Sequence, residues 1–232
     1  MKSKNKNKLI FIIKILIFYL LFFKSFFAYS QNVNIKDSFE KNLNNIYTVE
    51  FIFGKKNDRN NFLLSGLKIN LKPGWKIYWR NPGDAGLPPE LNWENIVNIN
   101  KVDFLFPKPK RFNFFGIDTF GYEGEVVFPV KIFKNNENKI IKGYLEFNAQ
   151  ICEKICIPIS NTIFINSAII NNQVKKNTKK IMSYLSLVPH ENKEENLYFK
   201  KIFISGEKLK FIFNEKVKVD TLDLIIEDDT SK

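Results

Sequence analysis

The stretch FLLSGLKINLKPGWKIYWR, residues 62–80, decides the fold class that we predict for this chain. In its first half, apolar residues recur at alternate positions, and alternate side chains in a strand project from the same face. Lys72-Pro73-Gly74 then has the composition of a turn, and the alternation resumes over 75–80. We therefore predict two strands, with Leu63, Leu67, Ile69 and Leu71 opposite Lys68 and Asn70 in the first, and Trp75, Ile77 and Trp79 opposite Lys76, Tyr78 and Arg80 in the second.

Short strands continue on both sides of this stretch. Loops are predicted at 81–89, which contains Asn81-Pro82-Gly83-Asp84, and at 107–116. About seven short strands without intervening helices are typical of a β-sandwich, so the predicted fold class is all-β. The other predicted strands are 47–53, 102–106, 125–133, 143–150 and 162–166.

One helix is predicted after the sandwich, at 173–188. Apolar positions recur there at intervals of three and four, and Pro189 ends the pattern. Its lysines, Lys175, Lys176, Lys179 and Lys180, are expected on a solvated face rather than in a binding patch. Strands are predicted again at 197–205, 209–214 and 222–226. The predicted domains are thus a signal peptide at 1–30, the sandwich at 31–190 and a short β segment at 191–232, which packs back on the sandwich or begins a second module.

The first 30 residues have the pattern of a secretory signal peptide. Four early lysines precede an apolar run at 9–27, and Ala28-Tyr29-Ser30 matches the small-x-small cleavage pattern, so cleavage is predicted after Ser30. Lys14 and Lys24 leave only 15–23 free of charge, whereas a membrane span needs about 20 apolar residues. An uncleaved anchor is the alternative, and it would be the only contact with the membrane. The mature chain is expected outside the cytoplasm.

The charge of the chain does not indicate a nucleic-acid partner. The formal net charge is +12, but the predicted signal carries six lysines and no acid, which leaves 30 basic against 24 acidic residues and a net charge of +6. Only three of the remaining basic residues are arginines, and the lysines are scattered among asparagines. Nucleic-acid binding favours clustered basic residues.

Cys152 and Cys156 are the only cysteines, and their spacing restricts their chemistry. In a straight strand residues four apart are separated by about 13 Å, whereas a disulfide needs Cα atoms about 4.4–6.8 Å apart. The segment must therefore turn, either as a helical turn or as a reversal between neighbouring strands. So small a ring removes little chain entropy, which favours redox chemistry, with a structural disulfide and two unpaired thiols as alternatives. The two cysteines and one distant histidine, His190, cannot supply the four ligands of a usual zinc site. No metal or other cofactor is expected.

Three motifs in order identify a family resemblance. They are LKPGWKIYWRNPGDAG at 71–86, GYEGEVVFPV at 121–130 and CEKICIP at 152–158. Together they resemble the N-terminal periplasmic domain of the DsbD/ScsB thiol:disulfide interchange proteins, over roughly 45–190. The resemblance implies an immunoglobulin-like sandwich in the periplasm, acting as a protein-disulfide reductase without a cofactor.

The resemblance also implies roles for particular residues and partners. Cys152 and Cys156 match the reactive pair, which would receive electrons from a membrane-embedded thiol reductase and pass them to periplasmic thioredoxin-like proteins, among them disulfide isomerases and cytochrome c maturation factors. Family members cover the resting pair with an aromatic cap, and Phe114-Phe115-Gly116 falls where that loop should be, with ordinary core packing as the alternative. Cys156 is the expected point of attachment to the partner, although Lys154 and Glu153 leave the local charge nearly balanced.

The sequence departs from this family in three respects. Phe112 and Asn113 stand where DsbD has acidic residues beside the cap. DsbD has a wider cysteine spacing, so the ring geometry and the potential do not carry over. The chain also contains neither the multi-span reductase domain nor a thioredoxin domain with its own Cys-x-x-Cys. We therefore expect electrons to come from a separate membrane protein.

Two further side-chain groups have alternative interpretations. Arg80 and Asp84 flank the Asn-Pro-Gly turn and are expected either to fix it as an ion pair or to contact a partner.

Exposed aromatic residues on a secreted sandwich can also stack on sugars, which makes a carbohydrate-binding module an alternative, although alternation favours core packing. A non-enzymatic adaptor with a structural disulfide is the other alternative. The aromatic residues concerned are Trp75, Tyr78, Trp79 and Trp93.

Overall fold

The structure is a computed structural model, and it describes residues 14–15, 43, 45–168, 173–189, 199–206, 208–213, 225 and 227. The chain divides into two compact units, Met1–Asn44 and Asn45–Lys232. The predicted signal peptide apart from residues 14–15, its cleavage site, and most of the predicted strand at 222–226 lie outside the described residues. Within the described residues no helix is long and apolar enough to cross a membrane.

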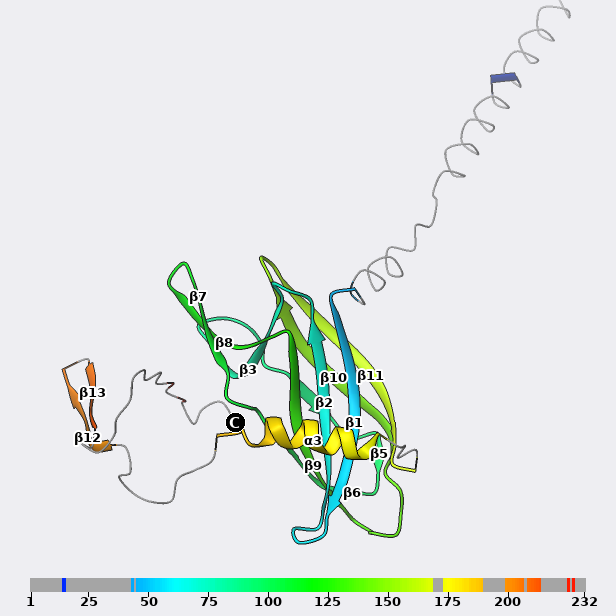
Figure 1. The fold of residues 1–232 in the computed structure, drawn as a ribbon. Coiled ribbons are helices and arrows are strands. Elements are labelled where there is room, and N and C mark those ends of the chain that lie inside the picture. The colour runs from blue at the N-terminus through cyan, green and yellow to red at the C-terminus, as the bar shows by residue number, and fades with distance from the viewer. Residues whose placement is uncertain are drawn as a thin grey trace, which may run out of the picture. The chain divides into compact units, whose positions relative to one another are not determined.

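The second unit contains two antiparallel sheets that form a sandwich (Figure 1). One sheet has the order β1-β2-β9-β6, and the other has the order β11-β10-β3-β8-β7, with β4 and β5 paired to β10. The strands are β1 (Tyr47–Asn57), β2 (Phe62–Leu71), β3 (Lys76–Gly83), β4 (Glu90–Asn92), β5 (Ile96–Val97), β6 (Ile99–Phe104), β7 (Lys110–Phe114), β8 (Ile117–Glu123), β9 (Glu125–Lys134), β10 (Lys142–Cys152) and β11 (Cys156–Asn166). The predicted all-β fold of the immunoglobulin-like kind is confirmed.

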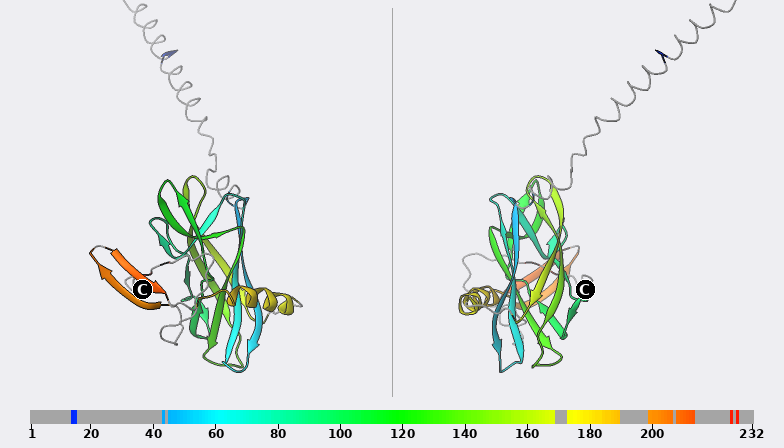
Figure 2. Two further views of the ribbon diagram at one scale, coloured as in Figure 1. Left: turned by 60° about the vertical axis from the view of Figure 1, so that its left-hand side comes forward. Right: turned by 90° about the vertical axis from the view of Figure 1, so that its right-hand side faces the viewer.

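Strand β2 lies inside the first sheet, between β1 and β9, and its alternation predicts its environment correctly. Leu67 and Ile69 are fully buried on the inner face, and Leu63 and Leu71 are nearly so. The opposite face of β2 carries Leu64, which is buried as well because α3 (Val174–Leu185) covers it. Figure 2 shows the two sheets as layers, with α3 against the sheet that contains β1 and β2.

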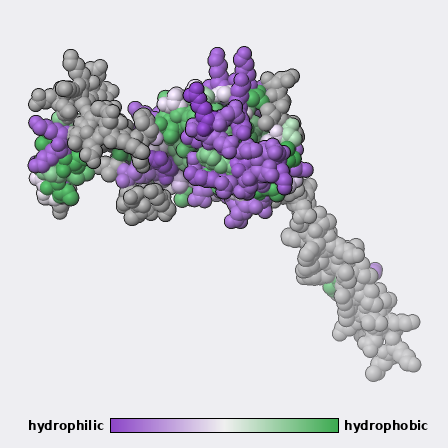
Figure 3. All heavy atoms as spheres, turned by 90° about the horizontal axis from the view of Figure 1, so that it is seen from below, coloured by the Kyte–Doolittle hydropathy of each residue, from purple (hydrophilic) through white to green (hydrophobic). Residues whose placement is uncertain are grey.

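Both ends of helix α3, Val174 and Leu185, lie within three residues of the predicted boundaries at 173 and 188. Ile181 is fully buried against the sheet, and the Thr178 hydroxyl accepts a hydrogen bond of 2.9 Å from the backbone N–H of Lys55 in β1. Three of the four lysines are exposed, as expected, whereas Lys180 forms an ion pair of 2.7 Å with Glu125. Viewed from below in Figure 3, the coloured surface of the sandwich is mostly hydrophilic.

The two sheets meet in an apolar core to which both contribute. Val130 and Ile132 of β9 pack with Leu145 of β10 and Ile165 of β11, all of them buried. At another part of the core the Phe128 ring is fully buried, and three aromatic rings lie within 5.1–5.5 Å of its centroid. These rings belong to Phe104, Phe106 and Tyr122.

The predicted loop at 107–116 is wrong in part, because β7 occupies 110–114 and pairs with β8. The apolar alternation in each strand is short, with Phe112 and Phe114 in β7 and Phe120 and Tyr122 in β8, and polar contacts across the hairpin add to its stability. Lys110 pairs with Glu123 and Arg111 with Asp118, both at 2.6 Å. After α3, β12 (Phe199–Ser205) and β13 (Lys208–Phe213) form a separate two-stranded sheet near the predicted positions.

Candidate functional site

The two cysteines lie opposite each other where β10 and β11 meet. The register of this antiparallel pair ends at Cys152↔Cys156, so residues 153–155 form the reversal between the strands. The Cα atoms are 4.1 Å apart and the two Sγ atoms form a disulfide of 2.03 Å. Of the two turns that the spacing permits, the chain uses the strand reversal.

The two sulfur-bearing residues differ in their access to solvent. Cys152 is only 2 % exposed, because β10 lies between β11 and β3 and Cys152 pairs with Lys76 of β3. Cys156 begins the edge strand β11 and is exposed, as are Glu153, Lys154 and Ile155 in the turn before it. A macromolecular partner can therefore reach Cys156 but not Cys152.

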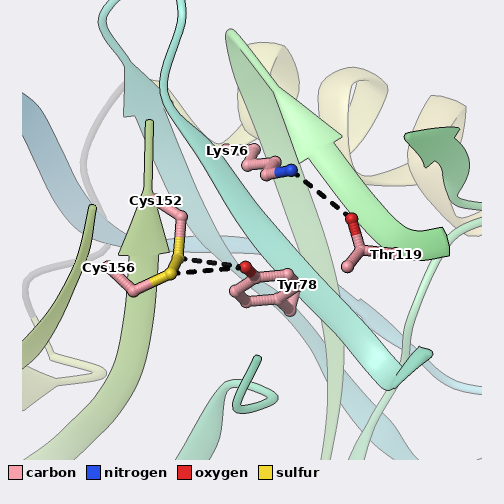
Figure 4. The surroundings of a disulfide bond; sticks show 5 residues. All are labelled: Lys76, Tyr78, Thr119, Cys152 and Cys156. Carbon is pink, nitrogen blue, oxygen red and sulfur yellow. Dashed lines mark hydrogen bonds between the residues drawn. A yellow bond between two sulfur atoms is a disulfide. The ribbon is translucent and has the colours of Figure 1, made fainter. Parts of the chain in front are cut away.

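The hydroxyl of Tyr78 lies against both sulfur atoms (Figure 4). Its oxygen is 3.0 Å from the Sγ of Cys152, to which it donates a hydrogen bond, and 3.6 Å from the Sγ of Cys156. Tyr78 is 3 % exposed, and burial raises the pKa of its hydroxyl above the ordinary value. The phenol therefore stays protonated at neutral pH and remains a donor toward the sulfur atoms.

Lys76 precedes Tyr78 by two residues but serves a different contact. Its Nζ lies 3.4 Å from the Thr119 hydroxyl and 5.1 Å from the centroid of the Phe112 ring. In Figure 4 the Lys76 side chain extends away from the disulfide toward Thr119. The side chain that contacts the sulfur atoms is therefore the neutral hydroxyl of Tyr78, for which the sequence predicted no role at the cysteine pair.

The predicted cap residues lie at the tip of the β7–β8 hairpin. Phe114 ends β7, and Phe115 has a positive φ of 52° and is 91 % exposed. The register places Glu123 of β8, and not the tip, level with Lys76 and hence with Cys152. The assignment of these phenylalanines as a cap stays a prediction.

Arg80 and Asp84 take part in separate interactions. Arg80 forms two hydrogen bonds with the carboxylate of Glu227, of 2.8 and 2.6 Å, and this contact raises the pKa of its guanidinium. Asp84 contacts β8: its N–H donates to the Asp118 carbonyl at 2.9 Å, and its Oδ2 accepts from the Asp118 N–H at 2.8 Å. Asp84 therefore fastens the loop after β3 to the neighbouring strand.

Asp118 also makes the hairpin sensitive to acid. Hydrogen bonds from Asn113 and Arg111, each 2.6 Å, lower the pKa of its carboxyl below the usual value. A lowered folded-state pKa contributes stability above the unfolded-state pKa, and this contribution is lost as the pH falls through the folded-state value. We expect Asp118→Asn to reduce the loss of unfolding free energy below about pH 4, as measured by urea titrations from about pH 6 to about pH 2. An unchanged pH profile would contradict the role of Asp118, and Asn113→Ala should give an intermediate profile.

The tryptophans give little support to a carbohydrate site. Trp79 is 3 % exposed, with its ring centroid 6.4 Å from that of Phe120. Trp93 is half-buried and packs edge-to-face on Phe51, at 5.9 Å. Trp75 is also half-buried. These positions agree with the core packing that alternation favoured.

Comparisons with known proteins bear on the same region. Residues 26–168 match the family model described as thiol:disulfide interchange protein DsbD, N-terminal. The N-terminal periplasmic domain of ScsB from Proteus mirabilis is similar in structure, with a TM-score of 0.49 and 25 % identity, over 63 % of this chain and 56 % of that one. The reduced DsbD N-terminal domain from Neisseria meningitidis gives a TM-score of 0.29 and 14 % identity, over 49 % and 90 %. This chain thus spans little more than half of the ScsB chain, and the comparison with curated proteins gave no match.

Proposed function

Because the chain belongs to the family of DsbD N-terminal domains, we propose that Cys152 and Cys156 alternate between disulfide and dithiol by exchange with partner proteins. The observation that carries this proposal is the asymmetry of the pair: Cys156 is an exposed residue, whereas Cys152 is buried and its Sγ accepts a hydrogen bond from a protonated phenol. An exchange reaction needs one sulfur that a partner can reach and a second that leaves or resolves.

Reduction of the pair begins at the exposed sulfur. A thiolate of the electron donor attacks the Sγ of Cys156, a new sulfur–sulfur bond forms, and the bond to Cys152 breaks. Cys152 leaves as a thiolate, which the Tyr78 hydroxyl stabilises by a charge-assisted hydrogen bond. The donor's second thiolate then attacks its own sulfur in the mixed disulfide and releases Cys156. Two electrons pass to the pair, two protons complete the dithiol, and the donor is left as a disulfide.

Oxidation of the pair follows the same bonds in reverse. The Cys156 thiolate attacks the disulfide of an acceptor, and Cys152 resolves the mixed disulfide by attacking the Sγ of Cys156. The acceptor departs as a dithiol, and the Cys152–Cys156 bond is restored. Every step uses sulfur chemistry alone, so the cycle requires no bound metal or organic cofactor.

The resemblance to the family suggests the partners and the compartment. The electron donor would be a membrane-embedded thiol reductase acting in trans, and the acceptors would be periplasmic thioredoxin-like proteins, including cytochrome c maturation factors. The predicted signal peptide would bring the chain to the periplasm, where disulfide chemistry operates. The predicted cap, Phe114 and Phe115, would shield the pair only in another conformation of the hairpin, because here Cys156 is exposed and Glu123, not the tip, lies level with Cys152.

Mixed-disulfide trapping tests the proposed function. Cys152→Ala leaves the exposed Cys156 without its resolving partner, so we expect it to accumulate covalent adducts with thioredoxin-like proteins in periplasmic extracts. Cys156→Ala leaves only the buried Cys152, so we expect few adducts or none. Adducts should be detected by non-reducing electrophoresis and identified by mass spectrometry, with the double variant as the control.

A structural disulfide would behave differently in the same cells. Thiol alkylation of the wild-type chain should reveal both dithiol and disulfide forms, and deletion of the membrane reductase should shift the population to the disulfide. A pair that is always oxidised, together with no adducts from Cys152→Ala, would overturn the proposal in favour of the adaptor.

A further inference from the structure

We propose that Gly86 is a positioning residue for the cysteine pair: its backbone packs against the Tyr78 ring and holds the phenol oxygen at the sulfur atoms. This inference rests on the proposed function and extends it to the loop that follows β3. The loop belongs to the NPGDAG stretch at 81–86, which ends the first family motif and for which the sequence predicted a turn, fixed by Arg80 and Asp84 or used in a partner contact.

The contact between Gly86 and Tyr78 leaves no space for a side chain. A Cβ at residue 86 would lie 2.4 Å from the Cζ of Tyr78 and 2.5 and 2.6 Å from the two Cε atoms. These three atoms form the hydroxyl end of the ring. Gly86 therefore lies against the end of the Tyr78 ring that carries the hydroxyl, and the Sγ of Cys152 lies 3.0 Å from the hydroxyl oxygen.

Hydrogen bonds to β8 anchor the start of the loop that contacts the Tyr78 ring. Asp84 exchanges two hydrogen bonds with Asp118, and Gly83 pairs with Thr119. A Cβ at Gly83 would come within 2.5 Å of the Asp118 carbonyl oxygen, so the loop and β8 are in direct backbone contact there. Gly86 lies two residues after Asp84, which is anchored to β8, and β8 itself pairs with β3 at Tyr78↔Gly121.

The arrangement matters because β3 is irregular just beyond Tyr78. Regular pairing with β8 stops at Tyr78 and resumes only at Gly83. Ladder hydrogen bonds therefore do not restrain the segment on the C-terminal side of Tyr78, and the ring depends on side contacts for its position. The loop supplies such a contact, and a ring displaced by about 1 Å would lose most of the hydrogen bond to Cys152.

The test measures how fast dithiothreitol reduces the disulfide, a reaction that needs no biological partner. We expect Gly86→Ala to slow the reduction about three- to tenfold, up to the effect of losing one charge-assisted hydrogen bond. In a Tyr78→Phe background the same change should alter the rate by less than about twofold, because no hydroxyl remains to be displaced. Such a double-mutant cycle separates an effect through the hydroxyl from general loosening of the fold.

Gly124→Ala is the matched control. Gly124 also has a positive φ, of 68°, compared with 110° at Gly86, but a Cβ there meets nothing within 4 Å. Its substitution should leave the rate within about twofold of wild type, since only backbone strain is added. A folded Gly86→Ala variant that reacts at the wild-type rate would overturn the inference, as would equal slowing in both backgrounds.

A second variant covers the case in which Gly86→Ala does not fold. Asp84→Ala removes the acceptor for the Asp118 N–H and adds no atom beside Tyr78. It should slow reduction about threefold with Tyr78 present and have no effect in the Tyr78→Phe background. A rate of Asp84→Ala equal to that of the wild-type chain would count against the inference. The proposed function fails on a different result, the absence of adducts with Cys152→Ala, which these rates do not measure.

Discussion

Tyr78→Phe is expected to lower the rate at which a dithiol reduces the Cys152–Cys156 disulfide by about tenfold at pH 7. The hydroxyl donates to the Sγ of Cys152 across 3.0 Å. As Cys152 leaves, negative charge develops on this sulfur, and a neutral hydrogen bond of about 0.5–1.5 kcal/mol becomes a charged one of about 1.5–3 kcal/mol. Only the strengthening acts on the rate, and about 1.4 kcal/mol corresponds to tenfold.

The measurement is a quenched reaction with dithiothreitol, followed by alkylation and mass analysis. Tyr144→Phe is the matched control, because Tyr144 also lies in the sheet of the site but is 55 % exposed and packs on Phe164. We expect its rate to equal that of the wild-type chain. Equal rates for Tyr78→Phe and Tyr144→Phe would show that the phenol does not stabilise the leaving sulfur.

Phe128→Ala is expected to reduce the free energy of unfolding by about 3–5 kcal/mol. Phe128 is fully buried and surrounded by three aromatic rings, with Tyr122 at 5.1 Å, Phe106 at 5.4 Å and Phe104 at 5.5 Å. Truncation removes the apolar surface of the ring and leaves a cavity that two paired sheets cannot easily close. Urea unfolding of the oxidised chain, monitored by circular dichroism, measures the change.

Phe164→Ala provides the comparison for the same chemical change outside the core. Phe164 is 47 % exposed and contacts Tyr144 at 5.3 Å. The expected loss is about 1 kcal/mol, because a half-exposed ring buries less surface and leaves no closed cavity. Similar losses for Phe128→Ala and Phe164→Ala would contradict the placement of Phe128 at the centre of the core.

The sequence predicted β2 well because the alternation from Leu63 to Leu71 follows the pleat and marks the face that enters the core. Burial of Leu64 on the opposite face depends on the packing of α3, which the alternation does not show. The β7–β8 hairpin has only a short pattern of this kind, and ion pairs such as that of Arg111 with Asp118 contribute to its stability. Pairing of this kind depends on the register between strands, which neither strand shows by itself.

Residue alternation and spacing are enough to predict the sandwich class and the turn at 152–156, and the resemblance of three motifs is enough to indicate the family. Such patterns are local and need no knowledge of distant contacts. The exposure of Cys156, the burial of Cys152 and the contact of Tyr78 with their sulfur atoms become visible only in the folded chain. The physical reason is the pairing of β10 with β3, which joins Ile151 to Ile77 and Cys152 to Lys76 across more than seventy residues of sequence. No local pattern around Tyr78 carries that register.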